Sequence, residues 1–229
     1  MKRKEKKEKK EIKIQIKKKA FIGVYDYTVI LTYLSLVSAV AGIILALEGE
    51  PTLAVLCVAF SGFCDAFDGA VARTKKNRTD DERNFGIQLD SICDVISFGV
   101  TPAVICYTLG VDGVIGFLFC AAYVLCALIR LAFFNVLEIK RQQVEDGAGK
   151  GYRGLPVTSI CFIFPAVYFC RYLLNWIFAP HGNMIFVVLL HVMLAVVAFL
   201  FILDFKMKKI NFDKLLGGKK SKKNFEKNS

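Results

Sequence analysis

The sequence predicts an all-α integral membrane protein with six transmembrane helices. Its 229 residues are 55% hydrophobic and yet carry a formal net charge of +11, and the mean hydropathy is +0.48. A soluble domain of this size could not bury so much apolar surface. The apolar residues also gather in six segments of about 20 residues, the length that a helix needs to cross a bilayer.

The six predicted spans alternate with short connections. They cover residues 27–47, 52–73, 85–109, 114–136, 155–177 and 184–205. The chain therefore divides into a basic N-terminal arm (1–26), a six-helix membrane domain (27–205) and a basic tail (206–229) that we expect to be disordered.

The basic residues predict how the spans are oriented, because cytoplasmic loops retain lysine and arginine while translocated loops are poor in them. Of the 31 lysines and arginines, 29 lie in residues 1–19, 73–84, 137–154 and 206–229. The three alternate connections contain none. We therefore expect both termini on the cytoplasmic side of the plasma membrane, with the basic segments facing membrane lipids and not nucleic acid.

The remaining two arginines, Arg130 and Arg171, fall inside predicted spans. Arg171 lies towards the outer end of the fifth span, where we expect it to snorkel outward or to pair with a backbone carbonyl. Arg130 lies in the cytoplasmic third of the fourth span, where it can balance nearby carboxylates or bind a ligand.

Four aspartates follow helical spacing on the second and third spans. Asp68 lies three positions after Asp65, and Gly69 and Ala72 continue the same stripe. At 1.5 Å per residue, these aspartates lie about 12 and 7 Å from the cytoplasmic end of the second span. One face of that helix is thus acidic and narrow.

The third span carries a matching stripe of Gly86, Asp90 and Asp94, spaced four residues apart. Asp90 and Asp94 lie about 6 and 12 Å from Gly86, so their depths match those on the antiparallel neighbour. The facing stripes predict one cluster of four carboxylates that opens to the cytosol.

Four anions in one pocket need neutralisation, and Mg²⁺, Mn²⁺ or Ca²⁺ are the cations that prefer carboxylate ligands. Two such ions would balance the four charges, an arrangement that clamps phosphates during substitution at phosphorus. The alternative is a set of salt bridges. Its arginines would be Arg73, Arg78, Arg83 and Arg130.

The complete pattern resembles the signature of the CDP-alcohol phosphatidyltransferases. Its eight positions are Asp65, Asp68, Gly69, Ala72, Arg73, Gly86, Asp90 and Asp94. Residues 74–85 form a longer connection than the family usually has, in a loop where insertions are tolerated. The resemblance implies a homodimer with a six-helix fold and a CDP-linked lipid as the donor.

The resemblance also implies a role for each residue of the signature. Asp65, Asp68 and Asp90 would hold Mg²⁺ or Mn²⁺. Asp94 would lie within reach of the metals and act as the general base. The nucleotide and phosphates would be bound by Asp65, Gly69, Ala72, Arg73 and Gly86.

Three further stretches are similar to the phosphatidylserine synthases of bacteria and archaea: "FGIQLDSICDVISFGVTPA" (85–103), "RLAFFN" (130–135) and "YRGLP" (152–156). The last two depart from that branch, with Phe133 in place of an arginine and Arg153 within a shortened motif. This resemblance implies L-serine as the acceptor, with Arg130 and Asn135 at its binding site. Arg130 suits the serine carboxylate.

Two other functions remain open from the sequence. The same reaction class could use glycerol phosphate or inositol phosphate as the acceptor. A cation channel or carrier also uses acids within the membrane, although carriers usually place them near the midplane on broken helices.

Overall fold

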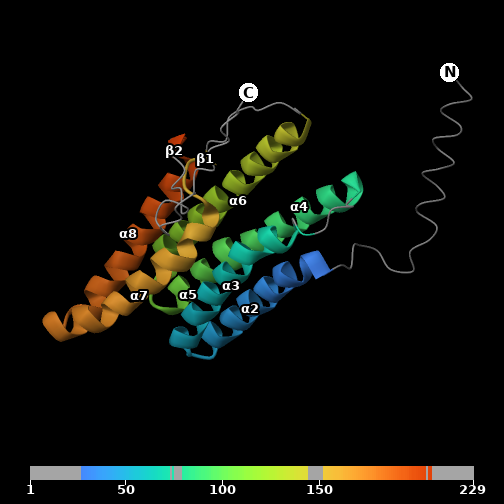
Figure 1. Cartoon of the computed structure of the whole chain (residues 1–229). Coiled ribbons are helices and arrows are strands. Elements are labelled where there is room, and N and C mark those ends of the chain that lie inside the picture. The colour runs from blue at the N-terminus through green and yellow to red at the C-terminus, as the bar shows by residue number, and fades with distance from the viewer. Residues whose placement is uncertain (1–26, 73, 75–78, 144–151, 205, 208–229) are drawn as a thin grey trace, which may run out of the picture.

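The computed structural model describes residues 27–72, 74, 79–143, 152–204 and 206–207. Six of its helical segments are long and apolar enough to cross a membrane, which confirms the predicted number of spans. They form an elongated bundle with α2 and α3 along one side and α7 and α8 along the other (Figure 1). In chain order the elements are η1 (Tyr27–Val29), α2 (Ile30–Leu47), α3 (Pro51–Ala72), α4 (Asp80–Asp94), η2 (Val95–Val100), α5 (Thr101–Thr108), α6 (Gly113–Gln143), β1 (Tyr152–Arg153), η3 (Val157–Ser159), α7 (Ile160–Ile177), α8 (Gly182–Ile202) and β2 (Lys206–Met207).

Small and hydroxyl residues join α2 to α3. The Ser35 hydroxyl donates to the carbonyl of Ser61 at 3.3 Å, and the Ser61 hydroxyl donates to the carbonyl of Ser35 at 2.9 Å. A Cβ on Gly42 would lie 3.0 Å from the Cβ of Cys57, so the backbones approach closely there. In an apolar medium, such close packing and interhelical hydrogen bonds hold neighbouring helices together. This seam fixes the face of α3 that carries the aspartates.

The third span starts at Asn84, close to the predicted edge, but the helix that carries it begins before the span itself. Thr79 caps α4: its hydroxyl accepts from the backbone N–H of Glu82 at 3.2 Å, and the Glu82 carboxylate accepts from the backbone N–H of Thr79 at 3.3 Å. This reciprocal capping box satisfies two N–H groups that the first helical turn leaves without partners. The helix therefore starts at Asp80, five residues before the predicted edge at position 85.

A π-helical turn, η2, follows Asp94 directly and continues into α5. The widened turn disturbs the regular helical hydrogen bonds, and side chains take up two of the carbonyls. The Tyr123 hydroxyl of α6 donates to the carbonyl of Phe98 at 2.6 Å, and the Thr101 hydroxyl donates to the carbonyl of Ile96 at 2.9 Å. The third span thus remains one continuous helical rod.

The core lies where α3, η2, α6, α7 and α8 meet. It contains fully buried side chains from each of these elements: Val55, Phe98, Tyr123, Phe164 and Leu190. Many large apolar side chains are instead exposed around the outside of the bundle, as expected for a surface that faces lipid.

The last described residues return to the connection between α6 and α7. Strands β1 and β2 pair antiparallel, with Tyr152 opposite Met207 and Arg153 opposite Lys206. The predicted tail therefore begins with a short strand, while its remainder, 208–229, lies outside the described residues, as does the arm 1–26. The domain boundaries and the cytoplasmic orientation of the termini stay predictions.

Candidate active site

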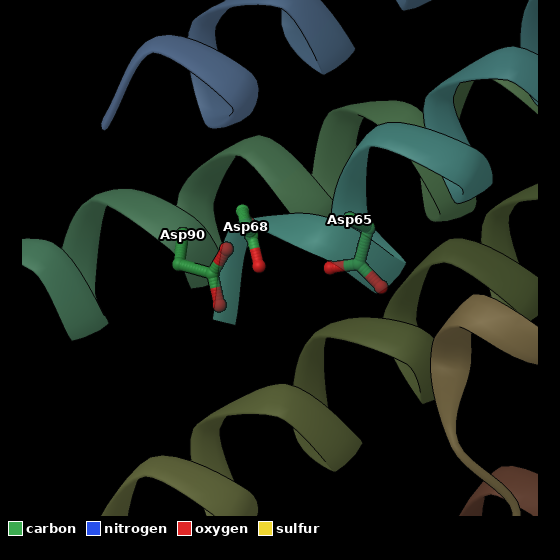
Figure 2. A group of neighbouring side chains, drawn as sticks. All are labelled: Asp65, Asp68 and Asp90. Carbon is green, nitrogen blue, oxygen red and sulfur yellow. The ribbon is translucent and has the colours of Figure 1, made fainter. Parts of the chain in front are cut away.

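Three of the four predicted aspartates come together between α3 and α4. Asp65 and Asp68 extend from α3 and Asp90 from α4, and their carboxylates face a common space (Figure 2). One carboxylate oxygen from each lies within 4.8 Å of the others. All three side chains are half-buried. The two acidic stripes thus meet at these residues, as the helical spacing predicts.

This donor set fits a divalent cation. Carboxylate oxygens are the ligands that Mg²⁺ and Mn²⁺ prefer, and three of them converge here from two rigid helices. Asp68 also accepts a hydrogen bond from the hydroxyl of Thr32 on α2, with 3.4 Å between the oxygens. Such contacts orient a carboxylate towards a metal. Thr32 was not among the residues predicted for the site.

Asp94 lies one helical turn beyond Asp90 and is not part of this group of three. Its side chain is only 8% exposed, whereas the other three aspartates are half-buried. Asp94 lines the same cavity as Asp65 and Asp90, deeper in the bundle. The structure therefore separates a half-buried acidic group from one enclosed carboxylate; a metal contact of Asp94 stays a prediction.

The cavity beside the aspartates has a volume of about 270 Å³ and also receives Arg130 and Asn135 from α6. Arg130 is 9% exposed, and its Nε donates to the backbone carbonyl of Leu155 at 3.3 Å. Within the described part of the chain, Arg130 forms no ion pair with Asp65, Asp90 or Asp94. The Leu155 carbonyl holds the Nε of the guanidinium, and Asp204, just after α8, also interacts with it electrostatically.

A hydrogen bond across the cavity fixes Asn135. The Ser91 hydroxyl of α4 donates to the Oδ1 of Asn135 at 2.7 Å, and both residues line the cavity. Ser91 was missed in the sequence analysis, although a signal was available. It is adjacent to Asp90 and three residues before Asp94, so it belongs to the polar part of that helix.

Gly154 brings the connection between β1 and α7 close to Arg130. Its φ of +69° lies in the left-handed region, where a side chain is strained. A Cβ at this position would lie 2.9 Å from the carbonyl oxygen of Leu203 and 3.2 Å from the guanidinium carbon of Arg130. The glycine in "YRGLP" thus lets the loop, the end of α8 and Arg130 pack together.

The structure describes only some of the other residues predicted to contact the nucleotide. Gly69 and Ala72 lie in the last turn of α3, just before Arg73, which is outside the described residues. Gly86 lies one turn before Asp90 on α4. Arg78 is outside the described residues as well, and the side chain of Arg83 is not described, so salt bridges from these arginines to the aspartates are not tested.

The spacing of the aspartates and the six spans can be compared with known families. A profile of the CDP-alcohol phosphatidyltransferases matches residues 28–200, which includes the first five spans and the sixth up to residue 200. The chain belongs to the CDP-alcohol phosphatidyltransferase family.

Several curated relatives carry more specific names. An archaetidylserine synthase of Methanothermobacter thermautotrophicus is 37% identical over 150 residues, covering 65% of this chain and 59% of the relative. A CDP-diacylglycerol–serine O-phosphatidyltransferase of Methanocaldococcus jannaschii is 32% identical over 151 residues, covering 64% of this chain and 65% of the relative. The enzyme of that name from Saccharomyces cerevisiae is 36% identical over 113 residues, covering 48% of this chain and 40% of the relative. Each match spans less than two thirds of the relative.

The described residues divide the candidate site into two parts. The half-buried group of Asp65, Asp68 and Asp90 suits a metal ion and a pyrophosphate. The enclosed part, with Asp94, Arg130 and Asn135, offers a carboxylate, a cation and an amide in one cavity.

Proposed function

We propose that this protein transfers a phosphatidyl group from a CDP-linked lipid to the hydroxyl of L-serine and releases CMP. The observation that carries the proposal is the joint lining of one cavity by Asp65, Asp90, Asp94, Arg130 and Asn135. The names of the relatives support serine as the acceptor and either ester-linked or ether-linked lipids as donors.

The donor would lie with its tails in the bilayer and its pyrophosphate beside the half-buried aspartates. A divalent ion held by Asp65, Asp68 and Asp90, Mg²⁺ or Mn²⁺, would offset the pyrophosphate charge and stabilise the departing CMP. Arg73, Gly69, Ala72 and Gly86 remain the proposed contacts of the nucleotide and its phosphates.

Arg130 and Asn135 would hold the serine. A guanidinium binds a carboxylate through two parallel hydrogen bonds. Arg130 brings this cation to the cavity, where Asp204 also acts on it electrostatically. The amide oxygen of Asn135 already accepts from Ser91, so its nitrogen is left to donate into the cavity. These donors match an amino acid carboxylate.

Asp94 would act as the general base. It accepts the proton of the serine hydroxyl while the serine oxygen forms a bond to the phosphorus that carries the lipid. The bond between that phosphorus and the bridging oxygen breaks, and its electron pair leaves with CMP. The enclosed position of Asp94 keeps bulk water away from the base itself.

The side of the membrane and the oligomeric state belong to the same proposal. The aspartates lie at the end of the bundle where α3 ends and α4 begins, next to the basic segment 73–84. The positive-inside rule therefore supports a cytoplasmic active site. A homodimer is proposed from the family resemblance alone.

One assay decides the reaction and the acceptor together. Purified protein would be incubated with CDP-diacylglycerol, Mg²⁺ or Mn²⁺, and L-serine, glycerol phosphate or inositol phosphate, with CMP and the lipid product measured by mass spectrometry. We expect CMP and phosphatidylserine when serine is the acceptor, and no CMP with glycerol phosphate or inositol phosphate. CMP release with another acceptor but not with serine would contradict the proposed acceptor. No CMP with any of them would contradict the reaction, and metal-dependent cation flux would then favour a carrier.

A further inference from the structure

A second cavity lies at the opposite end of the bundle from the aspartates. Its volume is about 340 Å³, and it is lined by the turn between α2 and α3, the end of α5, and parts of α7 and α8. Pro51 lines this cavity at the start of α3, and Asp68 lies 17 residues further along the same helix, about 25 Å away. The reaction proposed above does not use this cavity.

Arg171 is anchored at this cavity by two neighbours on α8. Its Nε donates to the Oδ1 of Asn183 at 3.3 Å, and its guanidinium carbon lies 5.6 Å from the ring centroid of Phe186. Phe186 is buried, with 2% of its surface exposed. Of the two expectations for Arg171, the described contacts show a side-chain amide and an aromatic ring as its neighbours and not a backbone carbonyl, while outward snorkelling stays a prediction. The guanidinium is fixed at the cavity wall.

Some hydrogen-bond donors at this cavity wall have no partner among the described residues. In the described part of the chain, the terminal nitrogens of Arg171 and the side-chain nitrogen of Asn183 have no hydrogen-bond partner. None of the described residues that line the cavity is a carboxylate, although Glu48 and Glu50 flank Gly49 in the nearby turn. A guanidinium and an amide that present free donors to one cavity form a site for an anion with several oxygens.

Two helices add to the positive potential there. Pro51 and Asn183 line the cavity from the first turns of α3 and α8, whose backbone N–H groups carry the positive end of the helix dipole. Arg171 is also the only arginine or lysine in residues 154–205. The site therefore has its own source of positive charge, independent of the basic segments elsewhere in the chain.

The depth of the cavity points to a lipid. Arg171 lies six residues, about 9 Å, before the end of α7. On the same turns, Tyr172 and Trp176 are 60% and 83% exposed. Tyrosine and tryptophan concentrate where lipid headgroups meet the hydrocarbon layer. The Arg171 guanidinium, which bonds to Asn183 in the first turn of α8, therefore lies near the headgroup region of that leaflet.

We propose that this cavity binds the phosphate of a membrane lipid, taken from the leaflet opposite the one that contains the aspartates. The lipid phosphate is held by Arg171 and Asn183, and the acyl chains remain in the bilayer beside α7. This site is separate from the donor lipid site, so the inference holds whichever acceptor the enzyme uses.

The test is native mass spectrometry of the full chain with phosphatidylglycerol added to the detergent. Three variants would be compared with the wild type: Arg171→Gln, Asn183→Asp and Arg130→Gln. Arg171→Gln removes the cation, and Asn183→Asp places a competing carboxylate beside it without reducing the size of the side chain. Arg130→Gln removes the other intramembrane arginine and serves as the matched control.

We expect the affinity for one phosphatidylglycerol to fall about tenfold or more in Arg171→Gln and Asn183→Asp, as the loss of a charge-assisted hydrogen bond predicts. Arg130→Gln should retain that lipid. CMP release by Arg171→Gln and Asn183→Asp should equal that of the wild type, which shows that both variants fold. Unchanged lipid affinity in both would overturn the site. Displacement of the lipid by an equal concentration of inorganic phosphate would overturn its assignment to a lipid.

Discussion

The hydroxyl of Ser91 donates a hydrogen bond to the Oδ1 of Asn135 at 2.7 Å, across the cavity that contains the aspartates. This bond ties α4, which carries Asp90 and Asp94, to α6, which carries Arg130 and Asn135. It therefore couples the half of the site that we assign to the metal and base to the half that we assign to serine.

Replacing Ser91 by alanine should weaken serine binding. The half-buried amide of Asn135 loses its partner and becomes free to rotate, so we expect the KM for serine to rise about fivefold, the effect of one neutral hydrogen bond of about 1 kcal/mol. The kcat should change little. Ser38→Ala is the matched control, because it removes a 3.0 Å bond to the Cys57 carbonyl far from the cavity. Equal KM values in Ser91→Ala and wild type would remove Ser91 and Asn135 from the acceptor site.

Replacing Asp94 by asparagine should lower kcat by about 10² to 10⁴, the usual contribution of a general base. The change keeps the shape of the side chain, so the affinity for CDP should stay close to that of the wild type. Asp112→Asn, in the exposed connection between α5 and α6, provides the matched control. Stopped assays of CMP release and calorimetry with CDP measure the two quantities. Turnover of Asp94→Asn at the rate of the wild type would exclude Asp94 as the base.

Replacing Gly154 by alanine should disturb Arg130. The new Cβ would meet both the Leu203 carbonyl and the guanidinium, and the left-handed backbone adds a cost of about 1 kcal/mol. Gly113→Ala carries the same backbone strain, with φ of +67°, but its Cβ would meet nothing within 4 Å. We expect both variants to unfold at lower temperature, and only Gly154→Ala to raise the KM for serine. A normal KM in Gly154→Ala would show that the loop does not position Arg130.

Replacing Thr32 by valine should weaken the metal site without touching a ligand. The change keeps the shape of the side chain and removes the hydrogen bond to Asp68, so the concentration of Mg²⁺ that gives half-maximal CMP release should rise about tenfold. Saturating Mg²⁺ should restore the rate. Thr52→Val removes a similar bond, to the Tyr168 hydroxyl at the other end of α3, and should leave the Mg²⁺ dependence unchanged. An identical dependence in both variants would argue against Asp68 as a ligand.

The residues that meet at the site could be predicted from the sequence because they lie on regular helices. The spacing of Asp65 and Asp68, and of Gly86, Asp90 and Asp94, fixes which side chains share a face, and the alternation of spans makes the two helices antiparallel. The number of spans followed from length and hydropathy in the same way. These inferences need only local geometry.

Other features depend on contacts that helical periodicity does not contain. Leu155 is 25 residues from Arg130 along the chain, and only the folded loop brings its carbonyl to the guanidinium. The π-helical turn after Asp94 depends on Tyr123 from another helix. By contrast, the capping box of Thr79 and Glu82 is visible as a short motif, and it could have located the start of helix α4 ahead of the third span.

The most direct test of the account is CMP release from CDP-diacylglycerol and serine in excess EDTA, followed by titration with Mg²⁺ or Mn²⁺. We predict that chelation stops the reaction of the wild type and that either ion restores it, whereas Asp65→Asn, Asp68→Asn and Asp90→Asn require much more metal or stay inactive. Undiminished CMP release in EDTA would contradict the central claim that these three carboxylates hold a divalent ion for the transfer.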